Sequence, residues 1–422
     1  MKKYRPRIAD KILQRKIASK GAVLIEGAKW CGKTTTACQI AKSVLYMQDP
    51  TQKQQNLELA EINPARLLQG KTPRLIDEWQ LAPKLWDAIR FEIDQRDEFS
   101  QFILTGSAVP ADMSEISHTG TGRISHMLMR PMSLLESEES TGSVSLKELF
   151  DGHTDINGNN NLDIDLLSFI ICRGGWPKSI DASHEVALQQ AIDYFDAIVN
   201  MDISRVDNVQ RDAEKSKRLL RSYARAIGTQ TKIPSITQDV LANELEENEN
   251  ISGKSVTINA YVNALKKIFV IEDTPAWNPN LRSKTAIRSS DTRYFTDPSI
   301  GTTALGLGPQ DLINDLNTMG LLFENLCIRD LRIYAEALDG NVYHYRDKNG
   351  LECDAVIHLR NGSYGLIEIK LGGDSRIAEG VETLNKLASN IDTSKMKAPS
   401  FKMVLTGVGN YAYKRKDDIL IV

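Results

Sequence analysis

Residues 27–34 read GAKWCGKT, a complete G-x-x-x-x-G-K-T pattern. The apolar segment 21–26 before it is typical of a short buried strand, and residues 35–42 after it are typical of a helix. A glycine-rich turn between a strand and a helix is the setting in which this pattern binds phosphate groups. The pattern therefore predicts a phosphate loop that binds a nucleoside triphosphate together with Mg²⁺.

Each fixed position of this loop has a physical role in that chemistry. Gly27 and Gly32 let the backbone approach the phosphates closely, and successive N–H groups at the start of a helix bind the phosphate oxygens. Lys33 would reach the β- and γ-phosphates, and Thr34 would bind Mg²⁺. We add Thr35, the next residue of the predicted helix, to the expected ATP-binding residues.

Acidic and hydroxyl side chains end two later predicted strands. Asp77 would hold Mg²⁺ through its water shell, and Glu78 would polarise the water molecule that attacks the γ-phosphate. Thr105 or Ser107 stands where a sensor of the γ-phosphate would lie. The alternative for these two hydroxyl groups is an ordinary polar strand end.

Arg123 comes just before the predicted strand 124–128. A guanidinium group there could reach the γ-phosphate of a neighbouring subunit as an arginine finger. That role would require a homo-oligomer. The alternative is an exposed surface arginine, and the sequence does not distinguish the two.

The composition is that of an ordinary globular protein, with 422 residues, of which 41% are hydrophobic and 25% charged. A net charge of -3 means that contact with nucleic acid would need a local basic patch. The cysteines are scattered without a C-x-x-C pair, which argues against a zinc site and favours a reducing compartment. No apolar run approaches the ~20 residues that span a bilayer, so we expect a cytoplasmic protein without membrane contact.

Residues 1–140 alternate short apolar runs with helical patterns, as an α/β sheet does. We expect strands at 22–26, 44–49, 74–77, 101–105 and 124–128. Residues 141–210 are expected to form a helical connecting region that contains a polar loop at 151–165. This loop resembles a calcium-binding loop, but Asn160 stands where the turn glycine belongs and Leu166 where the bidentate Glu belongs, so we favour a linker.

Helical spacing continues over residues 211–285, where the order of elements is that of a winged helix. We expect helices at 219–227, 236–246 and 255–267, with Ser255 as an N-cap, and a strand at 269–272. The third helix would dock in a DNA groove, although winged helices also bind proteins. The basic residues of the first helix could hold phosphates or form a solvated face; they are Lys215, Lys217, Arg218, Arg221 and Arg225.

Residues 286–422 return to an α/β pattern and carry a second set of acidic residues. Asp354 lies on a predicted hairpin, Glu368 and Lys370 share a face of the next strand, and Glu324 lies on the preceding helix. This order resembles the PD-(D/E)xK nuclease core. The resemblance implies that the three carboxylates hold Mg²⁺ and that Lys370 orients or activates the attacking water. The alternatives are surface charges on a hairpin, or a nuclease fold without cleavage.

The segments GAKWCGKT, LIDEWQ, ILTGS, RPMSLLE and RGGWP together resemble the AAA+ ATPases of a large prokaryotic family. In that family a P-loop core is joined to a winged helix and to a C-terminal domain long labelled as of unknown function. The resemblance covers essentially the whole chain and implies ATP as the ligand of the residues named above. Lys29 stands where Arg is more usual and Cys31 lies inside the loop, but neither change removes a required group.

These patterns predict an α/β protein with a P-loop AAA+ parallel sheet at 1–140, a helical connection at 141–210, a winged helix at 211–285 and a PD-(D/E)xK-like domain at 286–422. We expect it to bind and hydrolyse ATP with Mg²⁺ and to act on nucleic acid, DNA before RNA, through a metal-dependent nuclease domain. The alternative is a nucleotide-dependent regulatory protein whose nuclease-like domain is inactive.

Overall fold

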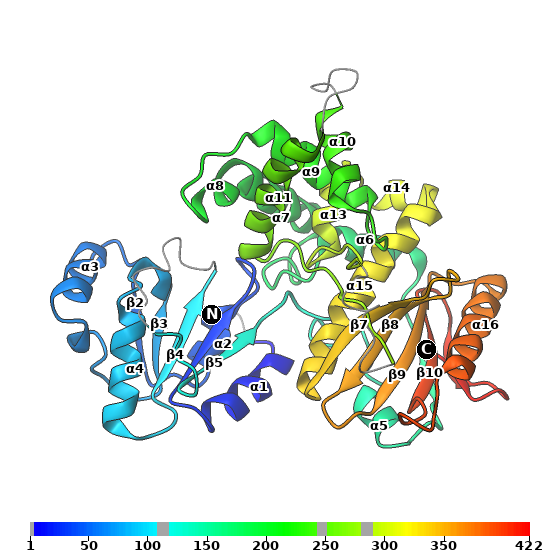
Figure 1. Cartoon of the computed structure of the whole chain (residues 1–422), viewed down its shortest axis with the longest axis horizontal. Helices are drawn as coiled ribbons and strands as arrows, with labels where there is room; N and C mark the ends of the chain where they lie inside the picture. Colours follow the sequence, from blue (N-terminus) through cyan, green and yellow to red (C-terminus); the bar gives the residue numbers. More distant parts are fainter. Residues whose placement is uncertain (1–3, 108–117, 243–250, 280–289) are drawn as a thin grey trace. The chain divides into compact units, whose positions relative to one another are not determined.

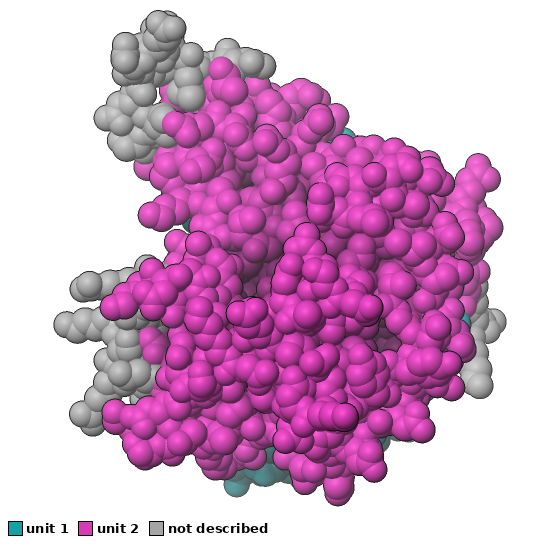
Figure 2. Space-filling model, turned by 90° about the vertical axis from the view of Figure 1, so that its right-hand side faces the viewer, with its two compact units in different colours: residues 1–131, 200–211, 263–270 teal, residues 132–199, 212–262, 271–422 magenta. Residues whose placement is uncertain are grey.

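The computed structural model describes residues 4–107, 118–242, 251–279 and 290–422. The chain folds into two compact units, which Figure 2 colours separately. Unit 1 contains residues 1–131, 200–211 and 263–270, and unit 2 contains residues 132–199, 212–262 and 271–422. The four-part division expected from the sequence cuts the chain differently, because unit 1 also includes two short segments of the helical region.

Unit 1 is built on a parallel sheet with the strand order β2–β3–β4–β1–β5 (Figure 1, blue to cyan). Its strands are β1 (Ala22–Glu26), β2 (Ser43–Tyr46), β3 (Arg74–Asp77), β4 (Phe102–Gly106) and β5 (Ile124–Leu128). Its helices include α1 (Ile8–Ile17), α2 (Lys33–Cys38), α3 (Lys53–Ile62), α4 (Leu85–Arg96) and α8 (Ile203–Arg205), with 3₁₀ turns η1 (Pro64–Arg66) and η2 (Trp79–Leu81). The strands predicted for this region are confirmed, with small shifts at their ends.

The apolar strands of this sheet bury both of its faces, as parallel strands generally do. Phe102, Leu104 and Ile76 are fully buried, and they pack with Trp79 and Trp86 from the segment after β3. Because all the strands run in parallel, their carboxyl ends meet at one edge of the sheet. This arrangement brings the phosphate loop, Asp77 and Thr105 to the same edge.

The helical part of unit 2 departs from the expected winged helix in its details. Its helices include α5 (Leu146–Phe150), α6 (Ile164–Arg173), α7 (His184–Ala197), α9 (Ala213–Arg225), α10 (Ile233–Leu241), α13 (Pro298–Leu305) and α14 (Pro309–Asn314). Helix α11 (Ile251–Lys267) and the π-helical turn η3 (Ile198–Asp202) begin in unit 2, and their last residues belong to unit 1. Ser255 lies inside α11 and not at its N-cap, since the helix begins at Ile251. Residues 243–246 of the second predicted helix lie outside the described residues.

The strand expected at 269–272 is wrong in its position. Phe269 has φ 58°, in the left-handed region, so the chain turns there and does not extend. Extended pairing begins two residues later, through antiparallel bridges from Ile271 to Phe295 and from Thr274 to Thr292. The winged-helix assignment stays a prediction.

A mixed sheet forms the second layer of unit 2, with the strand order β6–β11–β12–β10–β9–β8–β7. Its strands are β6 (Gly158–Asn159), β7 (Gly340–Arg346), β8 (Glu352–Leu359), β9 (Tyr364–Lys370), β10 (Phe401–Thr406), β11 (Tyr411–Lys414) and β12 (Ile419–Ile421). Helix α15 (Leu316–Ala337) packs on β7 and α16 (Asp374–Asn390) on β9 and β10 (Figure 1). The polar loop at 151–165 contributes β6, which pairs with β11.

Buried ion pairs join separate segments of unit 2. Arg329 on α15 lies 2.7 Å from Asp297 and 2.8 Å from Asp330, and the exposed fractions of the Arg329 and Asp297 side chains are 1% and 0%. Backbone N–H groups also bond to these acids: Gly175 donates to Asp297 at 2.9 Å and Leu134 donates to Asp330 at 2.8 Å. These bonds hold the segments before α6 and after it against α15.

Among the described residues, no helix is both long and apolar enough to cross a membrane.

Arg329→Met should destabilise unit 2 strongly. Removing the guanidinium group leaves Asp297 as a buried charge without its partner, which costs about 3–5 kcal/mol and corresponds to a fall in the unfolding midpoint on the order of 10 °C. The control is Arg376→Met, whose exposed ion pair with Glu379 contributes about 0–1 kcal/mol. Thermal unfolding followed by circular dichroism measures both variants. Equal midpoints for Arg329→Met and the wild type would contradict this account.

Candidate active sites

The phosphate loop joins β1 to α2 through a backbone that favours glycine. Gly27 has φ 145° and Gly32 has φ 102°. A Cβ atom at Gly27 would lie 2.0 Å from the carbonyl oxygen of Met129, so no larger residue fits there. Gly27 is therefore required by the close approach of the segment after β5, in addition to any role in binding phosphate.

Lys33 is buried, and its ammonium group folds over the loop. Its Nζ donates to the carbonyl oxygens of Gly27 and Ala28, both at 2.8 Å. Phosphate oxygens are stronger acceptors for an ammonium group than neutral carbonyls. The loop thus holds Lys33 where a bound phosphate could take over these bonds, while the Thr35 side chain is exposed on α2.

Asp77, buried at the end of β3, gathers three donors from neighbouring elements. Its Oδ1 accepts hydrogen bonds from Thr34 Oγ1 and Thr105 Oγ1, both at 2.6 Å. Its Oδ2 accepts one from Gln48 Nε2 at 2.5 Å. A hydroxyl and a carboxylate in contact are the hard oxygen ligands that Mg²⁺ prefers, so Thr34 and Asp77 fit this ion. Gln48 was missed by the sequence analysis, although it follows β2, the strand beside β3.

Glu78 follows Asp77 in an unusual backbone conformation, with φ 57° and ψ 47°. Few residues other than glycine adopt this left-handed region, and those that do often lie at functional sites. Its Oε2 accepts hydrogen bonds from Gln80 Nε2 and, at 3.2 Å, from Ser107 Oγ. Each acid therefore contacts one of the expected sensors: Asp77 contacts Thr105, and Glu78 contacts Ser107.

Two basic residues of unit 1 have acidic partners. Lys29 in the phosphate loop lies 2.5 Å from Asp202, a contact between residues 173 positions apart. Arg123 lies at the amino end of β5 and pairs with Asp94 of α4 at 2.8 Å. Because β5 has 5 residues, or roughly 16 Å of strand, Arg123 is far from the phosphate loop of its own chain. Its action on a neighbouring subunit stays a prediction.

The second site lies on the antiparallel strands β8 and β9 of unit 2, where Asp354, Glu368 and Lys370 form a cluster, here called the carboxylate cluster. Lys370 Nζ lies 3.1 Å from Asp354 Oδ2 and 2.6 Å from Glu368 Oε2. Asp354 Oδ2 also accepts a hydrogen bond from the N–H of Ile369 at 2.7 Å. Within the described part of the chain, the buried Glu368 Oε1 has no hydrogen-bond partner.

Burial and like charges shift the ionisation of this cluster. Burial, followed by the charge of Asp354, raises the pKa of Glu368 to about 8. Burial and the charge of Asp354 also raise the pKa of Glu324 well above its ordinary value. Burial alone would lower the pKa of Lys370, but the charges of Asp354 and Glu368 outweigh it and raise that pKa. Perturbed carboxyl groups of this kind are common at functional sites.

Glu324 does not join the cluster directly. The Tyr294 hydroxyl donates to Glu324 Oε1, and a Cβ atom at Gly228 would lie 3.1 Å from the same oxygen. Among the described residues, no group of three or more His, Cys, Asp or Glu side chains is arranged to hold a metal ion. Tyr294 thus bonds to Glu324, and Lys370 lies between Asp354 and Glu368. The metal-binding role of the three carboxylates stays a prediction.

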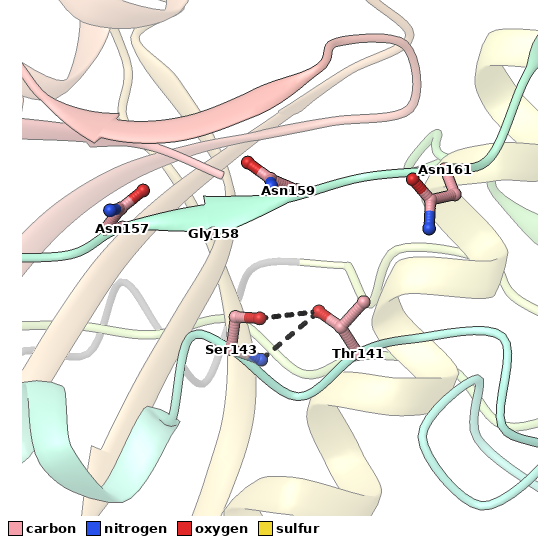
Figure 3. Close-up of a pocket in the computed structure, with 6 residues that line it drawn as sticks. All are labelled: Thr141, Ser143, Asn157, Gly158, Asn159 and Asn161. Atoms are coloured by element: carbon pink, nitrogen blue, oxygen red, sulfur yellow. Dashed lines mark hydrogen bonds between the residues drawn. The ribbon is translucent and has the colours of Figure 1, made fainter.

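A separate cavity of about 400 Å³ contains none of the expected site residues (Figure 3). It is lined by Thr141, Ser143, Asn157, Gly158, Asn159 and Asn161. Thr141 and Ser143 hydrogen-bond to each other at 2.8 Å.

Three family models match successive parts of the chain. Residues 19–138 match one described as "AAA domain". Unit 1 has the fold of an AAA-type P-loop ATPase. Beyond this AAA domain, residues 164–311 match "Domain of unknown function (DUF8612)" and residues 319–421 match "Domain of unknown function (DUF4143)". The last match includes Glu324 and the whole carboxylate cluster.

Two solved structures that are similar to this chain are distant from it. The Walker-type ATPase PABY2304 of Pyrococcus abyssi is 13% identical, with a TM-score of 0.41, over 70% of this chain and 94% of that chain. A variant of Thermotoga maritima RuvB is 14% identical, with a TM-score of 0.28, over 64% of this chain and 93% of that chain. These TM-scores are too low to support a functional comparison. No curated protein matches the chain.

Glu368→Gln should alter the pH dependence of stability. The carboxyl group has a pKa of about 8 in the folded protein against an ordinary value of 4.5, so the unfolded chain releases its proton first. The stability of the wild type therefore falls as pH rises from about 4.5 to about 8, because the folded state binds the proton more tightly. We expect Glu368→Gln to gain at least ~1 kcal/mol relative to the wild type over this range.

Denaturant unfolding of both proteins at several pH values measures this difference. The contact with Lys370 does not produce this pH-dependent difference in stability, because lysine stays protonated from about pH 4.5 to about pH 8. Glu61→Gln, at an exposed carboxyl group, is the control. A stability difference between Glu368→Gln and the wild type that does not change with pH would contradict the assignment.

Proposed function

We propose that unit 1 binds ATP with Mg²⁺ and hydrolyses it. The observation that supports this most is the contact of the buried Asp77 carboxylate with both Thr34 and Thr105, at 2.6 Å each. These bonds join the phosphate loop to the acid and to the polar end of the neighbouring strand. The AAA family match over residues 19–138 supports the same activity.

Each residue of the site has a distinct part in this proposal. The N–H groups of the loop and Lys33 bind the phosphates, and Thr34 and Asp77 hold Mg²⁺, which would offset the charge of the phosphate oxygens. Glu78 orients the attacking water, since its carboxylate lies beside Asp77 at the end of the sheet. Thr105 and Ser107 respond to the γ-phosphate through these acids. Arg123 of a neighbouring subunit would complete the site in a homo-oligomer.

Glu78→Gln should retain ATP binding and lose hydrolysis. The amide cannot accept a proton from water, and the loss of a general base lowers kcat by about 100-fold or more. Lys33→Ala should lose ATP binding as well, because the phosphates lose their cationic partner. Phosphate release and binding of a fluorescent ATP analogue separate the two effects. Glu61→Gln is the control, and hydrolysis at the wild-type rate by Glu78→Gln would reject the role of Glu78.

We also propose that unit 2 cleaves phosphodiester bonds at the carboxylate cluster. The specific observation in its favour is Lys370 placed between two carboxylates, one of which has a buried oxygen without a hydrogen-bond partner. Asp354 and Glu368 would bind a divalent cation, which would stabilise negative charge on the phosphodiester. Lys370 would then be free to orient the attacking water.

Lys370→Ala should abolish cleavage of plasmid DNA in the presence of Mg²⁺ or Mn²⁺, with and without ATP. Lys402→Ala is a matched control, since Lys402 lies on β10 of the same sheet and bonds to Asn385 at 2.7 Å. Agarose electrophoresis of the plasmid measures nicking and linearisation. Cleavage that persists in Lys370→Ala would point to a contaminant. No cleavage by the wild type under any condition would favour the regulatory alternative.

A further inference from the structure

Helix α9 separates apolar and basic residues onto opposite faces. Leu219, Leu220 and Tyr223 are fully buried in unit 2, whereas Arg221 and Arg225 are exposed and Lys217 is partly exposed. Lys217, Arg221 and Arg225 are four residues apart, so they follow one another along one side of the helix. We call these three residues the basic face of α9.

The positive charge of this face is not neutralised by strong partners. Arg221 forms no ion pair with any described residue. Lys217 lies 3.1 Å from Glu214 on the same helix, and Arg225 lies 3.6 Å from Asp239 of α10. Both pairs are exposed to water, where such pairs contribute about 0–1 kcal/mol. A phosphate group could therefore compete for all three cations.

The segment that follows α9 lies close to Glu324, an acidic residue of α15. Gly228 follows the end of α9, and its φ of 72° turns the chain so that its Cα lies against the carboxylate of Glu324. Two backbone hydrogen bonds hold the turn in place. The N–H of Gly228 donates to the carbonyl oxygen of Arg293 at 3.1 Å, and the N–H of Arg293 donates to the carbonyl oxygen of Thr229 at 2.9 Å. Glu324 lies on α15, which packs on β8 and β9, the two strands that carry the carboxylate cluster. The end of α9 thus lies near the helix that packs on the strands of the carboxylate cluster.

We propose that the basic face of α9 binds the phosphate backbone of duplex DNA and directs it to the carboxylate cluster. The direction of DNA to the carboxylate cluster rests on the proposed cleavage activity, whereas the binding of DNA by the basic face does not. From Lys217 to Arg225 the helix rises about 12 Å, a length that matches about three phosphates on one strand of B-DNA. A helix face also fits the wide major groove of B-DNA, whereas the major groove of an RNA duplex is too deep and narrow.

The test is fluorescence anisotropy of a labelled DNA duplex titrated with the full-length protein in EDTA, at several salt concentrations. EDTA removes divalent cations, so cleavage takes no part in the result. The variant Arg221→Ala/Arg225→Ala should bind at least about 10-fold more weakly and reduce the slope of log K against log salt by about 2, since each lost phosphate contact contributes about 0.9. The control Arg376→Ala/Lys395→Ala removes the same charge from other exposed sites of unit 2.

Three results would overturn the proposal: no binding of the wild type to duplex DNA, equal affinity and salt slope for the two double variants, or tighter binding of an RNA duplex than of DNA. The unfolding midpoint of the Arg221→Ala/Arg225→Ala variant, followed by circular dichroism, should equal that of the wild type, which shows that the variant is folded. Loss of DNA affinity in this variant, together with a wild type that never cleaves DNA, would support the basic face and reject only the proposed cleavage.

Discussion

The hydrogen bonds of the Asp77 carboxylate are the interaction on which the organisation of unit 1 depends. They connect α2 through Thr34, β4 through Thr105 and the end of β2 through Gln48. A buried charge is stable only where such donors surround it, so the acid requires the parallel strands to end together at this edge. The strand order with β1 between β4 and β5 then places the phosphate loop beside the acid. Mg²⁺ and phosphate chemistry needs the same grouping of oxygen and N–H ligands.

Unit 2 also contains buried charges that need hydrogen-bond partners, and they form two separate groups. Arg329 bonds to two buried acids, and backbone N–H groups donate to both of these acids, as suits a buried network that holds separate segments together. The carboxylate cluster is less complete, because among the described residues one oxygen of Glu368 lacks a hydrogen-bond partner. A structural network gains nothing from such an imbalance, whereas a site that binds a cation or substrate can use it. This difference distinguishes the two groups of buried charges.

The sequence predicted what depends on local patterns. The strands of unit 1 and the strands β8 and β9 follow from short apolar runs, and the pattern GAKWCGKT predicts the strand before it and the helix after it. The sequence did not predict contacts between distant residues, such as that of Lys29 with Asp202, 173 positions apart, or the hydrogen bond from Tyr294 to Glu324. The predicted strand at 269–272 was misplaced because the chain turns at Phe269, and the predicted N-cap Ser255 was misplaced because α11 starts earlier. The turn and the helix start are set by packing and not by composition. The short strands β11 and β12 carry too weak a pattern to be recognised alone.

The central claim is that the phosphate loop, held against Asp77, is a nucleotide site that works with Mg²⁺. Isothermal titration calorimetry of the wild-type protein with ATP, in Mg²⁺ and separately in EDTA, tests it most directly. The account predicts one ATP bound per chain, with clearly weaker binding in EDTA because Thr34 and Asp77 then share no cation with the phosphates. No heat of binding in Mg²⁺, or an affinity that does not depend on Mg²⁺, would contradict it.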